Sequence, residues 1–130
     1  MKSPKIEEGK RIRSEVLGKA YTDKSALKMD DFAAPMTELV MEYCWGTVWA
    51  RPGLPRKIRS LITVGILAAL NRSHELKTHM RGGINNGCTK EEILEVVLQA
   101  AIYCGVPAGA ESVKAMKEVL SELEQEKILK

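Results

Sequence analysis

Two residues that could handle a proton, Glu75 and His79, lie four positions apart near the middle of the chain. On a helix these positions share one face, so a carboxylate and an imidazole would be neighbours. Burial would raise the pKa of the glutamate and a charged partner would lower it again, so the pair could exchange a proton near neutral pH. The same spacing is common in surface ion pairs, and spacing alone leaves both interpretations open.

A metal site is not indicated by the remaining candidate ligands. The second of the two histidines, His74, would project about 140° away around the same helix, which is wrong for a shared ion. The three cysteines, Cys44, Cys88 and Cys104, form neither a CxxC pair nor a zinc pattern. We therefore expect no metal, and thiols that are mostly inert.

The segment before this pair predicts the element that positions it. Leu61 to Leu70 is almost continuously apolar, with only Thr63 and Gly65 interrupting it. Such a run indicates a helix buried on all sides, and it is roughly half the length needed to cross a bilayer. Polar residues then follow together at 71–79, so a reactive pair at the end of a buried helix would be shielded from water.

Length and charge limit the class of protein. The chain has 130 residues and a net charge of +3, which favours a single domain over residues 1–130 and gives no basic patch for nucleic acid. The charged start MKSPKIEEGK is not a secretory signal, so we expect a cytoplasmic protein without a membrane segment. With 45% apolar residues, a chain this short cannot bury them all, which favours a symmetric homo-oligomer.

The hydrophobic pattern has a helical period throughout, without strand-like alternation, and predicts an all-α bundle. Gly18 should end the first helix, Tyr21 to Asp31 should be a connection, and Thr89 with Glu92 forms a capping box. Gly82 and Gly83 inside a helix suggest close backbone approach. The predicted helices are Ile6–Leu17, Pro35–Val48, Pro55–Leu70, Ser73–Asn86, Thr89–Tyr103, with Tyr103 on its inner face, and Pro107–Leu123.

Two further groups allow a structural and a functional interpretation. Trp45 and Trp49 are four apart and should stack along one helix face, either in a core or subunit interface or as a pocket wall. Arg56, Lys57 and Arg59 lie at a helix N-terminus, where the macrodipole disfavours cations. Their partner is therefore either a neighbouring carboxylate or a bound anion.

Four separated motifs resemble the carboxymuconolactone decarboxylase family, and more narrowly its 4-carboxymuconolactone decarboxylase branch. The similarity spans about Gly18 to Met116, in order and with matching spacings. The motifs are WGTVWARPGL at 45–54, RSLITVGILAALNRSHELKTH at 59–79, NNGCTKEEILEVV at 85–97 and AIYCGVPA at 101–108.

The resemblance implies an all-helical fold related to the alkylhydroperoxidase type, assembled as a ring-like homo-oligomer, a hexamer or a trimer. It also implies a cofactor-independent reaction, in which 4-carboxymuconolactone loses carbon dioxide to give 3-oxoadipate enol-lactone in the protocatechuate branch of the β-ketoadipate pathway. The substrate is then a small carboxylated lactone.

This chemistry assigns provisional roles to particular residues. A cation must hold the retained carboxylate, a poorly hydrated wall must surround the departing one, and an acid must protonate the resulting carbanion. The expected set is Arg51 and Arg59 for the carboxylate, Trp45 and Trp49 for the wall, His79 tuned by Glu75 as the proton donor, and Gln99 with Tyr103 lining the same cavity.

Some departures keep other functions open. In the decarboxylase branch a histidine is frequent where this chain has Gln99, and glutamine cannot exchange a proton at neutral pH. An alkylhydroperoxidase-like reductase would need a CxxC pair before His79, where Arg72 and Glu75 stand instead. A family enzyme with another carboxylate or lactone substrate, and a non-catalytic oligomeric scaffold, also remain alternatives.

Overall fold

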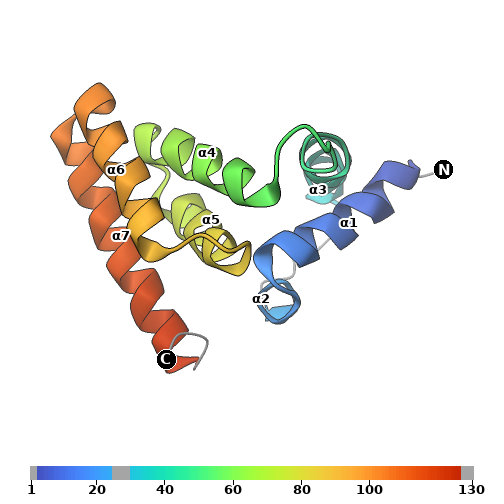
Figure 1. The fold of residues 1–130 in the computed structure, drawn as a ribbon. Helices are drawn as coiled ribbons and strands as arrows, with labels where there is room; N and C mark the ends of the chain where they lie inside the picture. The colour runs from blue at the N-terminus through green and yellow to red at the C-terminus, as the bar shows by residue number, and fades with distance from the viewer. Residues whose placement is uncertain (1–2, 25–29, 127–130) are drawn as a thin grey trace. The chain divides into compact units, whose positions relative to one another are not determined.

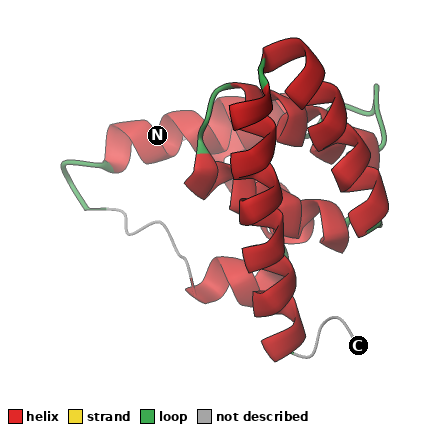
Figure 2. Cartoon of the chain, turned by 90° about the vertical axis from the view of Figure 1, so that its left-hand side faces the viewer, coloured by secondary structure: helices red, strands yellow, loops and turns green. Residues whose placement is uncertain are grey.

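The computed structural model describes residues 3–24 and 30–126, and within these ranges every regular element is a helix (Figure 2). The prediction of an all-α protein is confirmed. The elements shown in Figure 1 are α1 (Pro4–Leu17), α2 (Lys19–Lys24), α3 (Ala34–Leu39), the π-helix η1 (Val40–Val48), α4 (Arg56–Ala69), α5 (Ser73–Asn85), α6 (Lys90–Cys104) and α7 (Val106–Gln125).

The chain forms two compact units, an N-terminal unit that ends at Arg56 and a C-terminal unit that begins at Lys57. The expectation of one domain over residues 1–130 stays a prediction. No helix in the described part of the chain is long and apolar enough to cross a membrane.

The N-terminal unit is built on the packing of α1 against η1. Ser3 caps α1 by accepting a hydrogen bond from the Lys5 amide, and Gly18 ends it with a positive φ of 94°, as the sequence predicts. A Cβ at Gly9 would lie much closer to the Met41 carbonyl oxygen than the sum of their van der Waals radii, so the two helices touch backbone to backbone. The core comprises Ile6, Ile12, Val16, Leu17, Met41, Trp45 and Trp49.

Two details of this unit differ from expectation. The predicted connection from Tyr21 to Asp31 begins with a helix, because α2 continues the chain directly after Gly18 and buries Thr22; residues 25–29 lie outside the described part. The predicted helix over 35–48 exists, but its second half is a π-helix, a rare form that is frequent at functional sites.

The C-terminal unit packs α4, α5, α6 and α7 around one core. Local sequence signals set its turns: Gly87 has a φ of 96° after α5, and the Thr89–Glu92 capping box opens α6 as predicted. The core consists of Val64, Ala68, Leu76, Met80, Cys88, Ile93, Val97, Ala100, Ala115, Met116, Val119 and Leu123.

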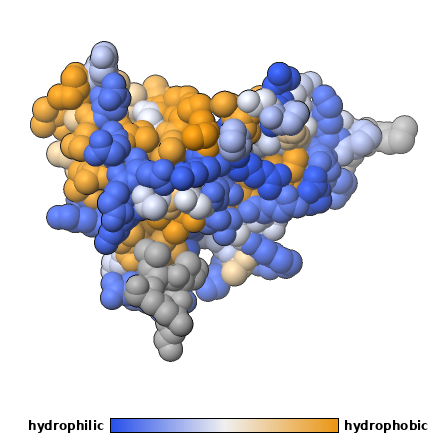
Figure 3. Space-filling model, viewed as in Figure 1, coloured by the Kyte–Doolittle hydropathy of each residue, from blue (hydrophilic) through white to orange (hydrophobic). Residues whose placement is uncertain are grey.

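The prediction that α4 is buried on all sides is wrong. Only Ser60, Val64 and Ala68 are buried on this helix, whereas Ile62 and Ile66 are about half exposed at 46% and 53%. The apolar run therefore provides one core face and one surface face, and a continuous apolar pattern cannot distinguish the two. Figure 3 shows apolar side chains exposed over the region of α4 and α6.

The expected close approach at the paired glycines is not found at Gly83. A Cβ there would meet Ile93 Cδ1 at 3.5 Å and Cys88 Sγ at 3.6 Å, which is ordinary van der Waals contact. Helix α5 therefore does not require a glycine at this position.

Candidate functional site

Helix α5 carries the proposed acid–imidazole pair. It buries Leu76 and Met80 in the C-terminal core, and His79, next to Met80, is half-buried with its Nδ1 atom shielded from solvent. Glu75 lies one turn earlier on the same face but is exposed. The predicted burial of Glu75 is therefore not found in the single chain, because the first turn of α5 is exposed to solvent.

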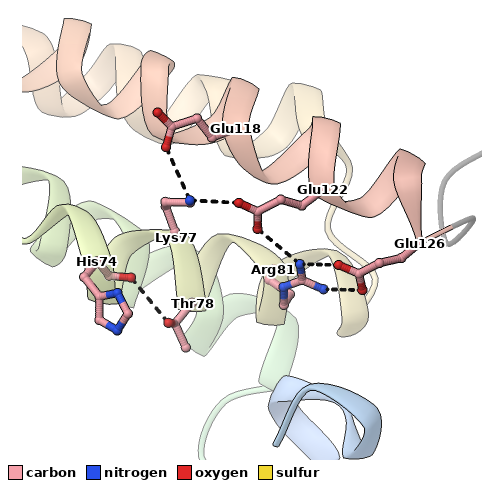
Figure 4. Close-up of polar contacts among 7 residues, drawn as sticks. All are labelled: His74, Lys77, Thr78, Arg81, Glu118, Glu122 and Glu126. Atoms are coloured by element: carbon pink, nitrogen blue, oxygen red, sulfur yellow. Dashed lines mark hydrogen bonds and ion pairs between the residues drawn. The ribbon is translucent and has the colours of Figure 1, made fainter. Parts of the chain in front are cut away.

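A ladder of ion pairs fixes α5 against α7 (Figure 4). Lys77 Nζ lies 2.9 Å from a Glu122 oxygen and 3.3 Å from a Glu118 oxygen. The buried Arg81 donates two hydrogen bonds to Glu126, at 2.8 and 3.0 Å, and one to Glu122 at 3.3 Å. Lys77, then Arg81, lower the pKa of Glu122, and Glu126 raises the pKa of Arg81. These contacts set the rotation of α5 about its axis.

A second anchor joins α5 to α4. The Asn86 side chain donates a hydrogen bond of 3.0 Å to the fully buried Ser60 hydroxyl. Because Asn86 follows the last residue of α5, this bond fixes the end of the helix opposite to Glu75. His79 therefore lies on a helix that is fixed along the side facing α7 by ion pairs and at its C-terminus by the Asn86–Ser60 hydrogen bond.

The larger groove in the C-terminal unit lies between α4 and α6 and has a volume of about 750 Å³. Gln99 and Tyr103 both line it, one turn apart, as does the exposed Cys104. Its charged lining residues are two carboxylates, Glu92 and Glu95. The full lining is Leu61, Ile62, Gly65, Ile66, Ala69, Glu92, Glu95, Val96, Gln99, Ala100, Tyr103 and Cys104.

The structure divides the residues predicted from the sequence into three groups. Glu75 and His79 share a face of α5, Gln99 and Tyr103 share the α4–α6 groove, and Arg59 lies half-buried near the start of α4. None of Glu75, His79 and Arg59 belongs to the described lining of that groove. The prediction that Tyr103 faces inward is wrong, because its side chain is 79% exposed beyond the buried face of α6.

The remaining candidates belong to the N-terminal unit. The rings of Trp45 and Trp49 stack with centroids 5.1 Å apart, as expected, and the two residues are only 4% and 6% exposed. They are therefore part of that unit's core, which supports the packing interpretation over a pocket wall. Arg51 is exposed shortly after η1.

The cations at the start of α4 include two with neighbouring carboxylate partners. Arg56 lies 2.8 Å from Glu15, and Lys57 lies 2.9 Å from Glu92. For Arg56 and Lys57, the interpretation that a neighbouring carboxylate compensates the unfavourable position at a helix N-terminus is confirmed. Sequence reasoning did not identify Glu92 and Glu95 as groove residues, although their helical spacing to Gln99 on α6 could have indicated it.

The thiols do not form a redox pair. Cys44, Cys88 and Cys104 are free, and burial raises the pKa of Cys44 and Cys88. Cys88 precedes α6 and Cys104 ends it, so a helix of about 20 Å separates them. This disfavours peroxidatic chemistry. Within the described residues, no group of three potential metal ligands is present.

Comparison with known proteins gives consistent matches. The model of the carboxymuconolactone decarboxylase family matches residues 34–118. The chain is 39% identical to a 4-carboxymuconolactone decarboxylase of Acinetobacter baylyi over 119 residues, which are 92% of this chain and 89% of the relative. It is 43% identical to a nitrosuccinic acid decarboxylase of Metarhizium robertsii over 118 residues, 91% of this chain and 82% of the relative.

Proposed function

The chain belongs to the carboxymuconolactone decarboxylase family, and we propose that it removes carbon dioxide from a small carboxylic acid without a cofactor. The observation that carries this proposal is the similarity, over nine-tenths of the chain, to two relatives that are both decarboxylases. The enzyme is therefore a carboxy-lyase, and its substrate is the open question.

The first candidate substrate is 4-carboxymuconolactone, which the relative at 39% identity decarboxylates by its name. This molecule is a lactone with two carboxylates. Loss of one as carbon dioxide leaves an electron pair that delocalises toward the lactone carbonyl, and protonation of the carbon gives 3-oxoadipate enol-lactone. In this reading the enzyme acts in protocatechuate breakdown.

The second candidate, nitrosuccinic acid, is favoured by the relative at 43% identity. Here the departing carboxylate is on the carbon that bears the nitro group, which accepts the electron pair as a nitronate. Both candidates are dicarboxylates in which an electron-withdrawing group stabilises the carbanion. One site that holds one carboxylate, stabilises negative charge and supplies a proton would serve both.

Residues of this chain can be assigned to those three tasks. His79 is the proposed proton donor, because a half-buried imidazole can carry a proton near neutral pH, with Glu75 as its neighbour. Arg59 and Arg51 are the proposed carboxylate anchors, since guanidinium binds carboxylate through a planar pair of donors. Gln99 and Tyr103 supply neutral hydrogen-bonding groups to substrate oxygens. The proposed wall of Trp45 and Trp49 has the weakest support, because both residues are buried in a core.

We also propose that the enzyme is a homo-oligomer, a hexamer or a trimer. Support comes from aliphatic side chains that are exposed in the single chain, among them Ile62 at 46%, Ile66 at 53% and Leu70 at 59%. Covering such side chains in a symmetric interface removes apolar surface from water.

The test is a direct assay of carbon dioxide release from both candidate substrates by the purified wild-type protein. Turnover of 4-carboxymuconolactone, followed by its absorbance, would support the first candidate, and turnover of nitrosuccinate alone would support the second. Release of carbon dioxide from neither would refute both assignments. Comparing each rate with that of His79→Gln then reports whether the imidazole participates.

A further inference from the structure

An exposed row of aliphatic side chains runs along the surface of α4. Ile58, Ile62, Ile66 and Leu70 recur every four residues, and their exposed fractions are 39%, 46%, 53% and 59%. We call these four residues the α4 ridge. Arg59 lies on the same side of the helix, three residues before Ile62 and seven before Ile66.

The described lining of the groove beside the α4 ridge contains no positively charged residue that could bind an anion. Ile62 and Ile66 form one wall, and Gln99 with Tyr103 lies on the other. The only charged residues in its described lining are Glu92, which pairs with Lys57, and Glu95, so the lining offers a dicarboxylate no cation. A substrate bound between Gln99 and Tyr103 therefore needs a cation that this lining does not supply.

We propose that, in a hexamer, α4 packs antiparallel against α4 of a second copy of this chain about a two-fold axis, which a three-fold trimer lacks, and that the second copy's Arg59 completes the Gln99–Tyr103 end of the groove. The substrate class, a small dicarboxylate, rests on the proposed function. The ridge then has two roles, since it buries exposed aliphatic surface and brings a guanidinium to the groove.

The antiparallel orientation follows from charge. Arg56 and Lys57 at the N-terminus of α4 pair with Glu15 and Glu92, but a parallel pair of α4 helices would still bring two Arg59 side chains together with two positive helix ends. An antiparallel pair separates these groups to opposite ends of the contact. Gly65 lies between the two central ridge residues in sequence but faces α6, because a Cβ there would lie 3.4 Å from Val96 Cγ1.

Symmetry then fixes which residues meet. Centring the contact on the ridge places Ile62 opposite the second copy's Ile66, and Ala69 opposite its Arg59. Helices α4 and α6 run alongside each other with Gly65 next to Val96, so Ala69 is level with the stretch between Gln99 and Tyr103. The second copy's guanidinium therefore arrives at the neutral polar end of the groove.

Cysteine cross-linking tests the orientation and the register. In a Cys104→Ser background, which removes the exposed native thiol from the groove, Ile62→Cys and Ile66→Cys are prepared separately and then mixed. We expect a disulfide-linked dimer on oxidation of the mixture and little in either protein alone. Strong cross-linking of each single variant with itself would show a parallel contact and overturn the proposal, as would no cross-link in the mixture.

Light scattering tests whether the ridge is an interface. Ile66→Asp should halve the mass of the assembly, because it places a charge in each copy of the contact. Ile102→Asp is the matched control: Ile102 is 79% exposed and aliphatic but does not line the groove. A monomeric wild type, an unchanged mass for Ile66→Asp, or an equal loss of mass in both variants would each contradict the proposal.

Binding of succinate, a plain dicarboxylate probe, tests the shared site. Arg59→Gln and Gln99→Ala should each lose binding, while circular dichroism shows that both remain folded. Random exchange of subunits between them should restore about a quarter of the wild-type sites, because half of the pairs are mixed and each mixed pair has one intact site. Failure of wild type to bind succinate, or no restoration on mixing, would refute site sharing. These experiments measure binding and not decarboxylation. Site sharing can therefore be refuted while the proposed function holds, and the proposed function can be refuted while site sharing holds.

Discussion

His79 and Glu75 share one face of α5 but have different surroundings. The imidazole is half-buried next to a fully buried methionine, whereas the carboxylate is exposed in the first turn. A half-buried imidazole can transfer a proton without full competition from water, while an exposed carboxylate contributes mainly through its charge. We therefore propose that His79 has the chemical role and that Glu75 is a secondary contributor.

We expect His79→Gln to lower kcat for the accepted substrate by a factor of about 10²–10⁴, the usual contribution of a positioned acid. His74→Gln is the matched control, since His74 is an exposed histidine on the same helix. Steady-state kinetics of both variants measure the effect. Equal activity of the two variants would exclude His79 from proton transfer.

Gly83 is a residue whose substitution should stabilise the fold. Its neighbours leave ordinary contact distance for a methyl group, and α5 gains helix propensity from alanine. We predict that Gly83→Ala raises the free energy of unfolding by about 0.5–1 kcal/mol. Urea denaturation followed by circular dichroism measures the change, and a lower midpoint would show that the site is tighter than these distances indicate.

At the scale of elements, the contact between α5 and α7 depends on ionised glutamates. Lys77 and Arg81 hold the pKa of Glu122 below the ordinary glutamate value. A depressed pKa in the folded state adds stability that is fully present above the ordinary value and is lost as pH falls through the folded value.

Glu122→Gln should therefore destabilise the protein at pH 7, and the difference from wild type should shrink as the pH falls below about 4. Glu124→Gln, an exposed substitution on the same helix, is the control and should match wild type throughout. Urea midpoints at several pH values measure this. A difference that persists unchanged at pH 3 would mean that the ion pairs do not cause it.

The close contact between α1 and η1 requires a glycine at position 9. A methyl group at Gly9 would overlap the Met41 carbonyl oxygen, and backbone cannot move aside as a flexible side chain can. We predict that Gly9→Ala lowers the free energy of unfolding by about 2–3 kcal/mol. Gly53→Ala is the control, because a Cβ there meets nothing within 4 Å. Thermal unfolding of both variants makes the comparison, and similar midpoints would mean that α1 and η1 can separate without cost.

Local signals explain which elements the sequence could predict. Gly18, Gly87 and the Thr89–Glu92 capping box act within a few residues, so their effects could be read directly. The exposure of Ile66 and Tyr103 depends on how helices pack, which the apolar pattern does not encode. For the same reason the sequence suggested candidate residues, but could not predict that they divide between α5 and the α4–α6 groove.

At the scale of the whole molecule, the two units have separate cores of unequal size. Among the described residues, the N-terminal core contains seven buried residues and the C-terminal core contains twelve. Because stability grows with buried apolar surface, the smaller core should be the less stable. The two tryptophans of the chain both lie in the N-terminal core, so their fluorescence reports on the packing of that core.

We therefore predict that tryptophan fluorescence changes at a lower urea concentration than far-UV circular dichroism, which reports helices from both units. Coincident transitions are the signature of a single cooperative unit, and separate transitions indicate that one part unfolds first. Gly9→Ala should move the fluorescence transition to lower urea and leave the later part of the dichroism transition in place. Overlapping curves for wild type, with both probes shifted together in Gly9→Ala, would instead show that the two cores unfold as one.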